Sequence, residues 1–178
     1  MDAVAVAAWV PAEEYLSTDY SPDCDYVDGA LEDRNVGEKD HSKVQMAIAA
    51  WLHLFENALR AGARRKELGI HVFPEQRIRI TSTRYRVPDI CVTIGEPDEQ
   101  VFTAAPFLCI EILSPEDRMS KVLVKIADYL GIGVAYVWLI DPRKQKATVY
   151  TATEALAVED GMLCTQNPEI VVPFSETF

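Results

Sequence analysis

The sequence predicts an α/β protein in which helices lie on the faces of a mixed β-sheet. A chain of 178 residues is typical of one domain with one core. Apolar residues recur every three or four positions in residues 40–61, which indicates a helix, and every second position in residues 71–95, which indicates strands. Apolar strands at 107–113 and 135–141 enclose a helical pattern at 116–131, so these residues predict a βαβ unit.

One domain is expected to span residues 1–178, with residues 1–10 as a flexible N-terminal arm. The arm has eight consecutive apolar residues, but it carries Asp2, lacks a basic flank and ends at Pro11. A secretory signal needs a basic start and a membrane span needs about 20 apolar residues, so we expect neither.

Two helices are predicted to carry the main apolar faces. In the helix at 40–61, Asp40 can act as N-cap, and one stripe contains Val44, Ala47, Ile48, Trp51, Phe55 and Leu59. The helix at 116–131 is expected to begin after Ser114, its N-cap, with Asp117 close to a capping-box position. Its buried stripe is predicted to contain Met119, Val122, Leu123, Ile126 and Leu130.

The other predicted elements are strands joined by short turns. Residues 24–37 predict a hairpin that turns at Asp28-Gly29. Residues 146–152 are expected to pair antiparallel with the strand at 135–141, because a turn separates the two segments.

The net charge of −11 argues against a protein that coats nucleic acid by charge alone. The charge is uneven, since residues 1–40 contain eleven acids and two bases, whereas residues 60–86 contain eight bases and two acids. The basic segment could contact phosphates, or it could pair with the acidic N-terminal part. The sequence leaves both possibilities open.

Several classes of site are excluded by the motifs that the sequence lacks. It has four cysteines, Cys24, Cys91, Cys109 and Cys164, but no CxxC pair, which argues against structural zinc and favours a reduced, cytoplasmic compartment. It has no Gly-rich phosphate loop, nucleophile elbow or HExxH motif. Nucleotide-binding folds, serine hydrolases and zinc metalloproteases are therefore not expected.

Glu111 and Asp89 are the first candidates for chemistry. Glu111 interrupts the apolar strand at 107–113, and a carboxylate in such a strand must be paired, protonated or metal-bound. Asp89 follows Pro88 and directly precedes the predicted strand at 90–94, a place that a turn residue could also occupy. Two carboxylates on neighbouring strands suit Mg²⁺, which prefers oxygen ligands and can activate water for phosphodiester hydrolysis. The alternative for Glu111 is a structural ion pair with an arginine.

Lysines on the helix at 116–131 are the candidate cationic partners. Lys125 lies on the border of the apolar stripe, so its side chain could reach back over the sheet to orient water or hold a phosphate. Lys121 lies on the same helix, and an exposed helix lysine is the simpler alternative for both residues.

Weaker candidates lie elsewhere in the chain. His41 and Gln45 are four residues apart near a helix N-terminus, a place that favours anions such as phosphate. Glu32 and Glu75 each lie in a predicted strand and could supply a further oxygen ligand. The alternative for His41 is a packing role, and the alternative for Glu32 and Glu75 is that they are surface carboxylates.

Four segments together resemble the Uma family of restriction endonucleases, which belongs to the PD-(D/E)XK superfamily. They are YVDGALEDRNVGEKDHSKVQ (26–45), RYRVPDICV (84–92), IEILSPEDR (110–118) and KIADYLGIGVAYVWLIDP (125–142). The resemblance covers about residues 11–175. It implies a restriction-endonuclease-like core with helices flanking a central mixed sheet.

The resemblance also implies a metal site. Asp89 and Glu111 would bind Mg²⁺ or Mn²⁺, with Glu32 as the similar N-terminal acid. The superfamily lysine would stand at Leu113, and in sequences of this family it appears on the following helix, which matches Lys125. Many members carry an aspartate four residues before that lysine, where this chain has Lys121.

These observations predict a Mg²⁺-dependent DNA endonuclease, which the superfamily suggests is a homodimer. The residues expected to contact nucleic acid are Arg77, Arg79, Arg84, Arg86, His41 and Gln45. The main alternative is a catalytically inactive protein of the same fold that binds DNA or another protein. A nuclease for RNA, or for branched or single-stranded DNA, is the second alternative, because base-specific loops are not recognisable in one sequence.

Overall fold

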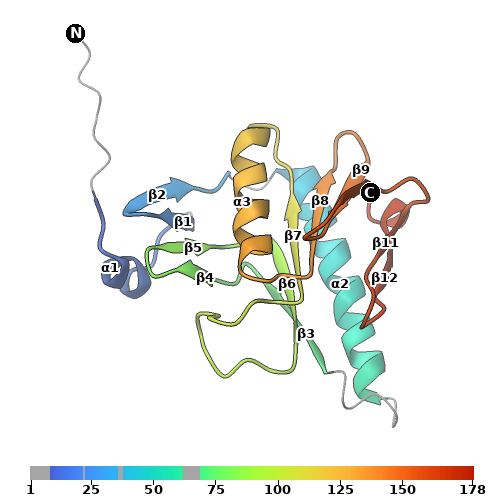
Figure 1. The fold of residues 1–178 in the computed structure, drawn as a ribbon. Helices are drawn as coiled ribbons and strands as arrows, with labels where there is room; N and C mark the ends of the chain where they lie inside the picture. Colours follow the sequence, from blue (N-terminus) through green and yellow to red (C-terminus); the bar gives the residue numbers. More distant parts are fainter. Residues whose placement is uncertain (1–8, 22, 36–37, 62–68) are drawn as a thin grey trace.

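The protein is described by a computed structural model that covers residues 9–21, 23–35, 38–61 and 69–178. Figure 1 shows its elements, which are α1 (Ala12–Ser17), β1 (Cys24–Val27), β2 (Ala30–Asp33), α2 (Lys39–Ala61), β3 (Ile70–Pro74), β4 (Ile78–Thr81), β5 (Arg84–Arg86), β6 (Ile90–Ile94), β7 (Leu108–Ile112), α3 (Met119–Gly131), β8 (Tyr136–Asp141), β9 (Lys146–Tyr150), β10 (Ala155–Ala157), β11 (Met162–Cys164), β12 (Val171–Pro173) and a 3₁₀ turn at Phe174–Glu176.

The central sheet of the described chain has the strand order β10-β9-β8-β7-β6-β3. Its β7 and β8 run parallel on either side of α3 in the sequence, whereas the other neighbours pair antiparallel. All five residues of β7 are buried, as expected for a strand covered on both faces. The predicted mixed sheet, the βαβ unit and the antiparallel pairing of β9 with β8 are therefore confirmed.

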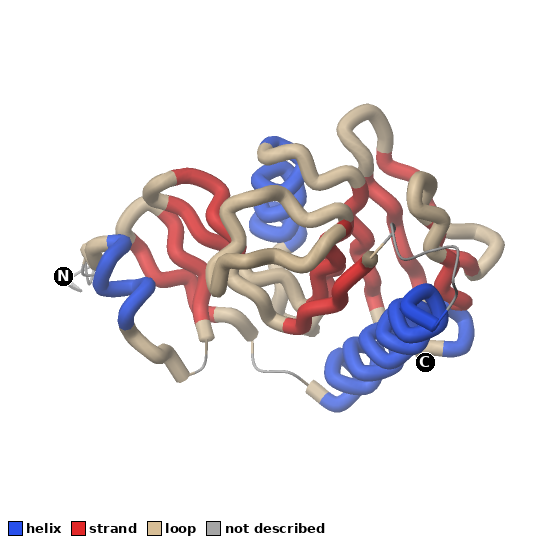
Figure 2. Tube along the Cα trace, turned by 90° about the horizontal axis from the view of Figure 1, so that it is seen from below, coloured by secondary structure: helices blue, strands red, loops and turns tan. Residues whose placement is uncertain are grey.

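Two helices cover opposite faces of this sheet. Alternate residues of β7 face α2, where Leu108, Ile110 and Ile112 join a core with Val44, Ile48, Leu52 and Trp138. The intervening Cys109 belongs to a second core with Val122, Ile126 and Tyr129 of α3. Figure 2 shows the sheet between the two helices. Glu111 shares the face of Cys109 and therefore points towards α3.

A smaller sheet lies beside α3, with the order β2-β1-β5-β4. Its β1 and β2 form the predicted hairpin, which turns at Asp28 and Gly29, both with positive φ. Tyr15, Tyr26 and Tyr85 stack in the core of this sheet. The chain passes from β5 to β6 through the buried residues 87–89, so Asp89 lies where the two sheets meet.

The start of α3 differs from the prediction. The helix begins at Met119, because residues 114–117 form a tight turn instead of its first turn. The N–H of Ser114 donates to Asp117 Oδ2 at 2.7 Å, and the N–H of Asp117 donates to the Ser114 carbonyl at 3.1 Å. Ser114 and Asp117, which were predicted to cap the helix, instead close a turn that precedes it.

The buried faces of both helices are rotated from the predicted stripes. In α2, Leu52 is fully buried whereas Trp51 is 39% exposed. In α3, Tyr129 is buried whereas Met119 and Leu123 are exposed. Both helices carry apolar residues around more than half of their circumference, so spacing alone does not identify the row that faces the sheet.

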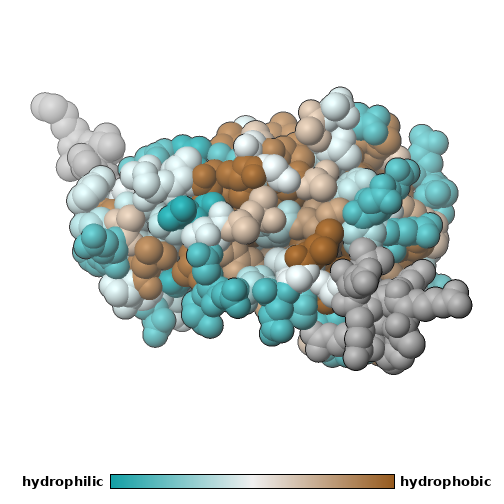
Figure 3. Space-filling model, turned by 60° about the horizontal axis from the view of Figure 1, so that its bottom comes forward, coloured by the Kyte–Doolittle hydropathy of each residue, from teal (hydrophilic) through white to brown (hydrophobic). Residues whose placement is uncertain are grey.

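The surface of the described chain mixes apolar and polar side chains. Figure 3 shows small brown patches separated by teal side chains on one face. No helix among the described residues is long and apolar enough to cross a membrane. Of the predicted N-terminal arm, residues 1–8 lie outside the described residues, and the N–H of Val10 donates to the Gly29 carbonyl at 2.9 Å.

The core under α2 makes a prediction for stability. Replacing the fully buried Ile48 with alanine should lower the free energy of unfolding by about 2–5 kcal/mol, because it leaves a cavity against the sheet. Met46, which is 71% exposed on the same helix, is the matched control, and its change to alanine should cost about 0.5 kcal/mol or less. Urea denaturation measures both values. Equal losses in the two variants would contradict this packing of α2.

Candidate functional site

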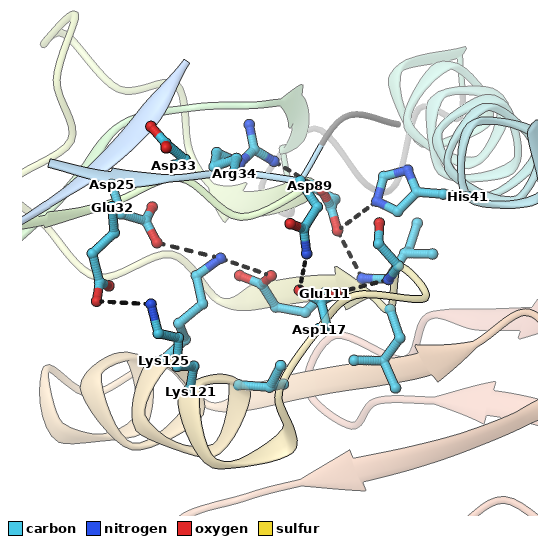
Figure 4. Close-up of a pocket in the computed structure, with 15 residues that line it drawn as sticks. Asp25, Glu32, Asp33, Arg34, His41, Asp89, Glu111, Asp117, Lys121 and Lys125 are labelled. Atoms are coloured by element: carbon cyan, nitrogen blue, oxygen red, sulfur yellow. Dashed lines mark hydrogen bonds and ion pairs between the residues drawn. The ribbon is translucent and has the colours of Figure 1, made fainter. Parts of the chain in front are cut away.

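Polar side chains from both sheets and both long helices converge on one pocket of about 90 Å³ (Figure 4). The residues that line it are Asp25, Glu32, Asp33, Arg34, Asn35, His41, Asp89, Glu111, Ile112, Leu113, Ser114, Asp117, Lys121, Val122 and Lys125. It contains six acidic side chains and three basic ones, Arg34, Lys121 and Lys125. If all of these are ionised and His41 is neutral, the lining has a net charge of −3.

Asp89 is held from several sides. Its Oδ2 accepts the backbone N–H of Ile112 at 2.7 Å and lies 3.3 Å from His41 Nε2. Its Oδ1 accepts a hydrogen bond from Arg34 Nη2 at 2.8 Å. Gln45 Nε2 donates to its carbonyl oxygen at 3.1 Å. The carboxylate is therefore fixed to β7 through one oxygen, while a side chain binds the other.

Glu111 lies opposite on the neighbouring strand β7 and is 7% exposed. Lys125 Nζ donates to its Oε2 at 3.1 Å, and the Tyr129 hydroxyl donates to its Oε1 at 2.7 Å. Both partners lie on α3, so this helix holds the glutamate in place. The alternative of an ion pair is realised with a lysine, and the carboxylate still lines the pocket.

The pKa values of the two carboxyl groups are shifted in opposite directions. Burial alone would raise the pKa of Asp89, but the hydrogen bond from His41 and the charge of Arg34 bring that pKa below its ordinary value. Burial raises the pKa of Glu111 above its ordinary value, and the charge of Lys125 only partly offsets this. Neighbouring carboxyl groups with divergent pKa values are typical of catalytic sites.

Lys125 extends back from α3 over the sheet. Its Nζ lies 3.1 Å from Glu111 Oε2 and 3.4 Å from Asp25 Oδ2, and its side chain is 16% exposed. Burial lowers the pKa of Lys125, but Glu111 and Asp25 raise it above its ordinary value, so the lysine is charged at neutral pH. Its action on water or phosphate stays a prediction.

The donor set of the pocket suits a hard cation. Mg²⁺ is usually bound by one or two carboxylates, with water and substrate oxygens completing its shell, and Asp89 and Glu111 provide two carboxylates in one pocket. Within the described ranges, no group of three His, Cys, Asp or Glu side chains is close enough to hold an ion. The two carboxylates of Asp89 and Glu111 are thus the part of the lining that an ion such as Mg²⁺ could use.

The family model described as "Putative restriction endonuclease", Uma2, matches residues 12–173 of the 178. The chain belongs to the Uma2 family. A search of curated proteins gave no match. The resemblance inferred from the sequence motifs is thus confirmed.

A solved structure shares the fold of this Uma2 chain. It is described as a crystal structure of a putative nuclease belonging to DUF820 from Anabaena variabilis ATCC 29413. The match has a TM-score of 0.71 and 24% sequence identity, and it covers 95% of this chain and 93% of that one. The nuclease-like fold class is therefore confirmed.

Asp25 is a pocket residue that the sequence analysis of this Uma2 chain missed. It is 3% exposed, and its Oδ1 accepts the backbone N–H of Val87 at 2.9 Å. Glu32, the predicted N-terminal acid, lies directly across the hairpin from Asp25 and pairs with Arg86 at 2.8 Å and Lys121 at 3.6 Å. Asp25 is the member of this pair that contacts Lys125. An aspartate within the apolar strand CDYV was its available signal, the same signal that identified Glu111.

Two further pocket residues, Arg34 and Asn35, carried no sequence signal. Arg34 follows β2 among polar neighbours, so nothing marked it before its contact with Asp89 was known. Asn35 Nδ2 donates to Asp117 Oδ1 at 2.7 Å, an exposed hydrogen bond at the rim of the pocket. These residues are 55 to 82 positions from their partners in the chain, and only the fold brings them together.

The predicted phosphate contact of Arg86 needs correction. This side chain is buried, and its guanidinium binds Asp25, Glu32 and Asp128 at 2.8–3.1 Å. Arg84, on the same face of β5, pairs with Asp28 and Asp128. Both side chains, which were expected to contact DNA, instead point towards the acids of the hairpin and α3.

Among the other residues predicted to contact nucleic acid, some contact acidic residues of the protein and one is exposed. Arg77 lies 3.8 Å from Asp23 and stacks over Tyr15, whereas Arg79 is exposed. His41 and Gln45 both contact Asp89. Within the described part of the basic segment, pairing with the acidic N-terminal region thus accounts for most arginines, and residues 62–68 lie outside the described residues.

The Arg86 cluster predicts a large loss of stability on truncation. Arg86→Ala leaves the buried Asp25 without its main cation, so we expect the free energy of unfolding to fall by about 3–5 kcal/mol. The exposed Arg79→Ala is the matched control and should change it by about 0.5 kcal/mol or less. Chemical denaturation compares the two, and a neutral Arg86→Ala would show that the cluster contributes nothing.

Proposed function

We propose that this protein is a divalent-metal-dependent endonuclease that hydrolyses phosphodiester bonds of DNA. The observation that carries the proposal is the convergence of Asp89 and Glu111, from neighbouring strands, on one pocket that also contains Lys125. The Uma2 family and the nuclease-like fold support the same class of reaction.

Asp89 and Glu111 are the residues that would hold Mg²⁺ or Mn²⁺. When bound, such an ion lowers the pKa of water and stabilises the charge that grows on a phosphodiester. Glu32 lines the same pocket at 33% side-chain exposure and would contribute through water. His41 and Ile112 orient Asp89, and Tyr129 orients Glu111, so both carboxylates are positioned before the ion arrives.

Lys125 is proposed to position the attacking water or to stabilise charge on the phosphate. Its ammonium has three donors; one is accepted by Glu111, and Asp25 lies within ion-pair distance at 3.4 Å. Because its pKa lies above the ordinary value, it acts as a fixed positive charge and not as the base that removes a proton. Lys121 lies at the rim and is 65% exposed, where it can meet the DNA backbone.

The assembly and location of the protein belong to the same proposal. A homodimer follows from the family resemblance, and two copies of the site would cut two strands. A cytoplasmic location agrees with four cysteines that are all free thiols.

One observation favours the second candidate function, a catalytically inactive module. Asp89 and Glu111 already have internal cations as partners, Arg34 at 2.8 Å and Lys125 at 3.1 Å. In that case the pocket would be a structural charge cluster, and the protein would bind DNA or a protein partner without cleavage.

Plasmid cleavage in Mg²⁺ or Mn²⁺ tests the proposal. Asp89→Ala and Glu111→Gln should each lower the cleavage rate by at least about 100-fold, because each removes a carboxylate that would hold the ion, and the ion stabilises the charge of the transition state. Asp98→Ala, at an exposed carboxylate outside the pocket, should retain the wild-type rate.

Calorimetric titration with Mn²⁺ separates the alternatives. Binding to the wild-type protein that is lost in Asp89→Ala agrees with the nuclease, whereas absence of both binding and cleavage favours the inactive module. A panel of RNA, single-stranded and branched DNA substrates identifies the class of nucleic acid that is cut.

A further inference from the structure

Arg34 is a cation in the pocket wall that the proposed reaction leaves unassigned. It directly follows β2, and its side chain is 14% exposed. Its Nη2 donates to Asp89 Oδ1 at 2.8 Å, and its Nη1 lies 3.8 Å from Glu75 Oε1. Figure 4 shows it beside Asp89 on the hairpin side of the pocket.

The two oxygens of Asp89 differ in what holds them. Oδ2 accepts the N–H of Ile112, and that bond cannot be given up without disturbing β7. Oδ1 is bound by the side chain of Arg34, from the segment after β2, and not by a backbone group of the sheet. Oδ1 is therefore the oxygen that a metal ion could bind with the smaller disturbance of the fold.

A divalent ion and Arg34 compete for this oxygen. The guanidinium interacts favourably with Asp89, Glu111 and Asp25, so it now occupies part of the negative field that would attract the ion. Two cations on one carboxylate oxygen repel each other, and the repulsion is strong in a site with little water. An ion bound at Oδ1 would displace the guanidinium from Asp89.

The charges of the pocket indicate where the displaced guanidinium would bind. Lys125 stays between Glu111 and Asp25, and Lys121 pairs with Glu32. The lining has six acids against three bases, so it repels a phosphate unless a divalent ion offsets part of this charge and leaves one of the cations free to contact the phosphate. Arg34 and Lys125 each contact a predicted metal ligand, Asp89 at 2.8 Å and Glu111 at 3.1 Å. Lys125 also has a buried second carboxylate, Asp25 at 3.4 Å, whereas the second contact of Arg34 is the exposed Glu75 at 3.8 Å, so Arg34 is the easier cation to release. A planar guanidinium also matches phosphate oxygens with two parallel hydrogen bonds.

We propose that Arg34 is a phosphate-binding residue that leaves Asp89 Oδ1 when a divalent ion binds and then contacts a non-bridging oxygen of the DNA phosphodiester. This inference rests on the proposed function. It makes Arg34 a link between metal binding and DNA binding, because the same guanidinium opposes the ion in free protein and holds DNA when the ion is present.

Binding measurements test this link without relying on cleavage. The affinity for a short fluorescent DNA duplex is measured by anisotropy in EDTA and in Ca²⁺, with a gel to verify intact DNA. Arg34→Gln is compared with wild type and with Arg143→Gln, a change at an exposed arginine outside the pocket. Calorimetry with Mn²⁺ alone gives the metal affinity of each protein.

Two opposite effects are expected in Arg34→Gln. Mn²⁺ should bind about threefold to tenfold more tightly than to wild type, because the competing guanidinium is gone. The increase in DNA affinity from EDTA to Ca²⁺ should be about tenfold smaller than in wild type, the value of one hydrogen bond to a charged group. Arg34→Lys should keep part of that increase, and Arg143→Gln should match wild type in the Ca²⁺-dependent increase.

Other outcomes distinguish this inference from the proposed function. Weaker Mn²⁺ binding by Arg34→Gln would show that Arg34 only positions Asp89, and an unchanged Ca²⁺-dependent increase would exclude the phosphate contact. Either result overturns the inference while the nuclease proposal stands. A wild-type protein that binds no Mn²⁺ overturns both.

Discussion

The pairing of buried charges is the constraint on which the structure depends. Asp25, Arg86, Asp89 and Glu111 are each 7% exposed or less, and they lie where the small sheet, the central sheet and α3 meet. An unpaired ion in such a place costs several kcal/mol, so each group needs its partner in position. Because the partners come from different elements, the hairpin, β5, β7 and α3 cannot shift independently of one another.

The ion pairs that stabilise the fold also oppose the proposed binding of a metal ion. Internal cations stabilise the carboxylates of the pocket, but they also occupy the oxygens that we propose as metal ligands. Sites that carry surplus charge of one sign are commonly less stable than their surroundings, and this chain offsets its surplus of acids with arginine and lysine. The arrangement keeps the metal-free protein folded without filling its pocket with apolar side chains.

Patterns in short stretches of sequence predicted the scaffold and pointed to two residues that line the pocket. The apolar runs of β7 and β8 identified the parallel pair, and the acid within β7 identified Glu111, because burial of a lone carboxylate is costly wherever it occurs. Asp89 was identified mainly through the family motif around Pro88. These features depend on neighbours close in sequence or on a whole set of motifs.

The features that the sequence did not predict depend on distant contacts. Asp25 and Glu32 are opposite each other across the hairpin, and the position of α3 decides which of them meets Lys125. Arg86 has the same local pattern as an exposed strand arginine, and only the packing of α3 against β5 buries it. In the same way, the rotation of α2 against the sheet decides between Leu52 and Trp51.

The bond between Asn35 and Asp117 has a consequence for access to the interior. Asp117 spans the pocket mouth, since one oxygen closes the turn after β7 and the other holds the segment after β2. Its outer bond is exposed to water, so it contributes only about 1 kcal/mol to holding the two segments together. The side chains of Asn35 and Asp117 thus join two walls of a cavity of about 90 Å³ through a contact that water can replace at little cost.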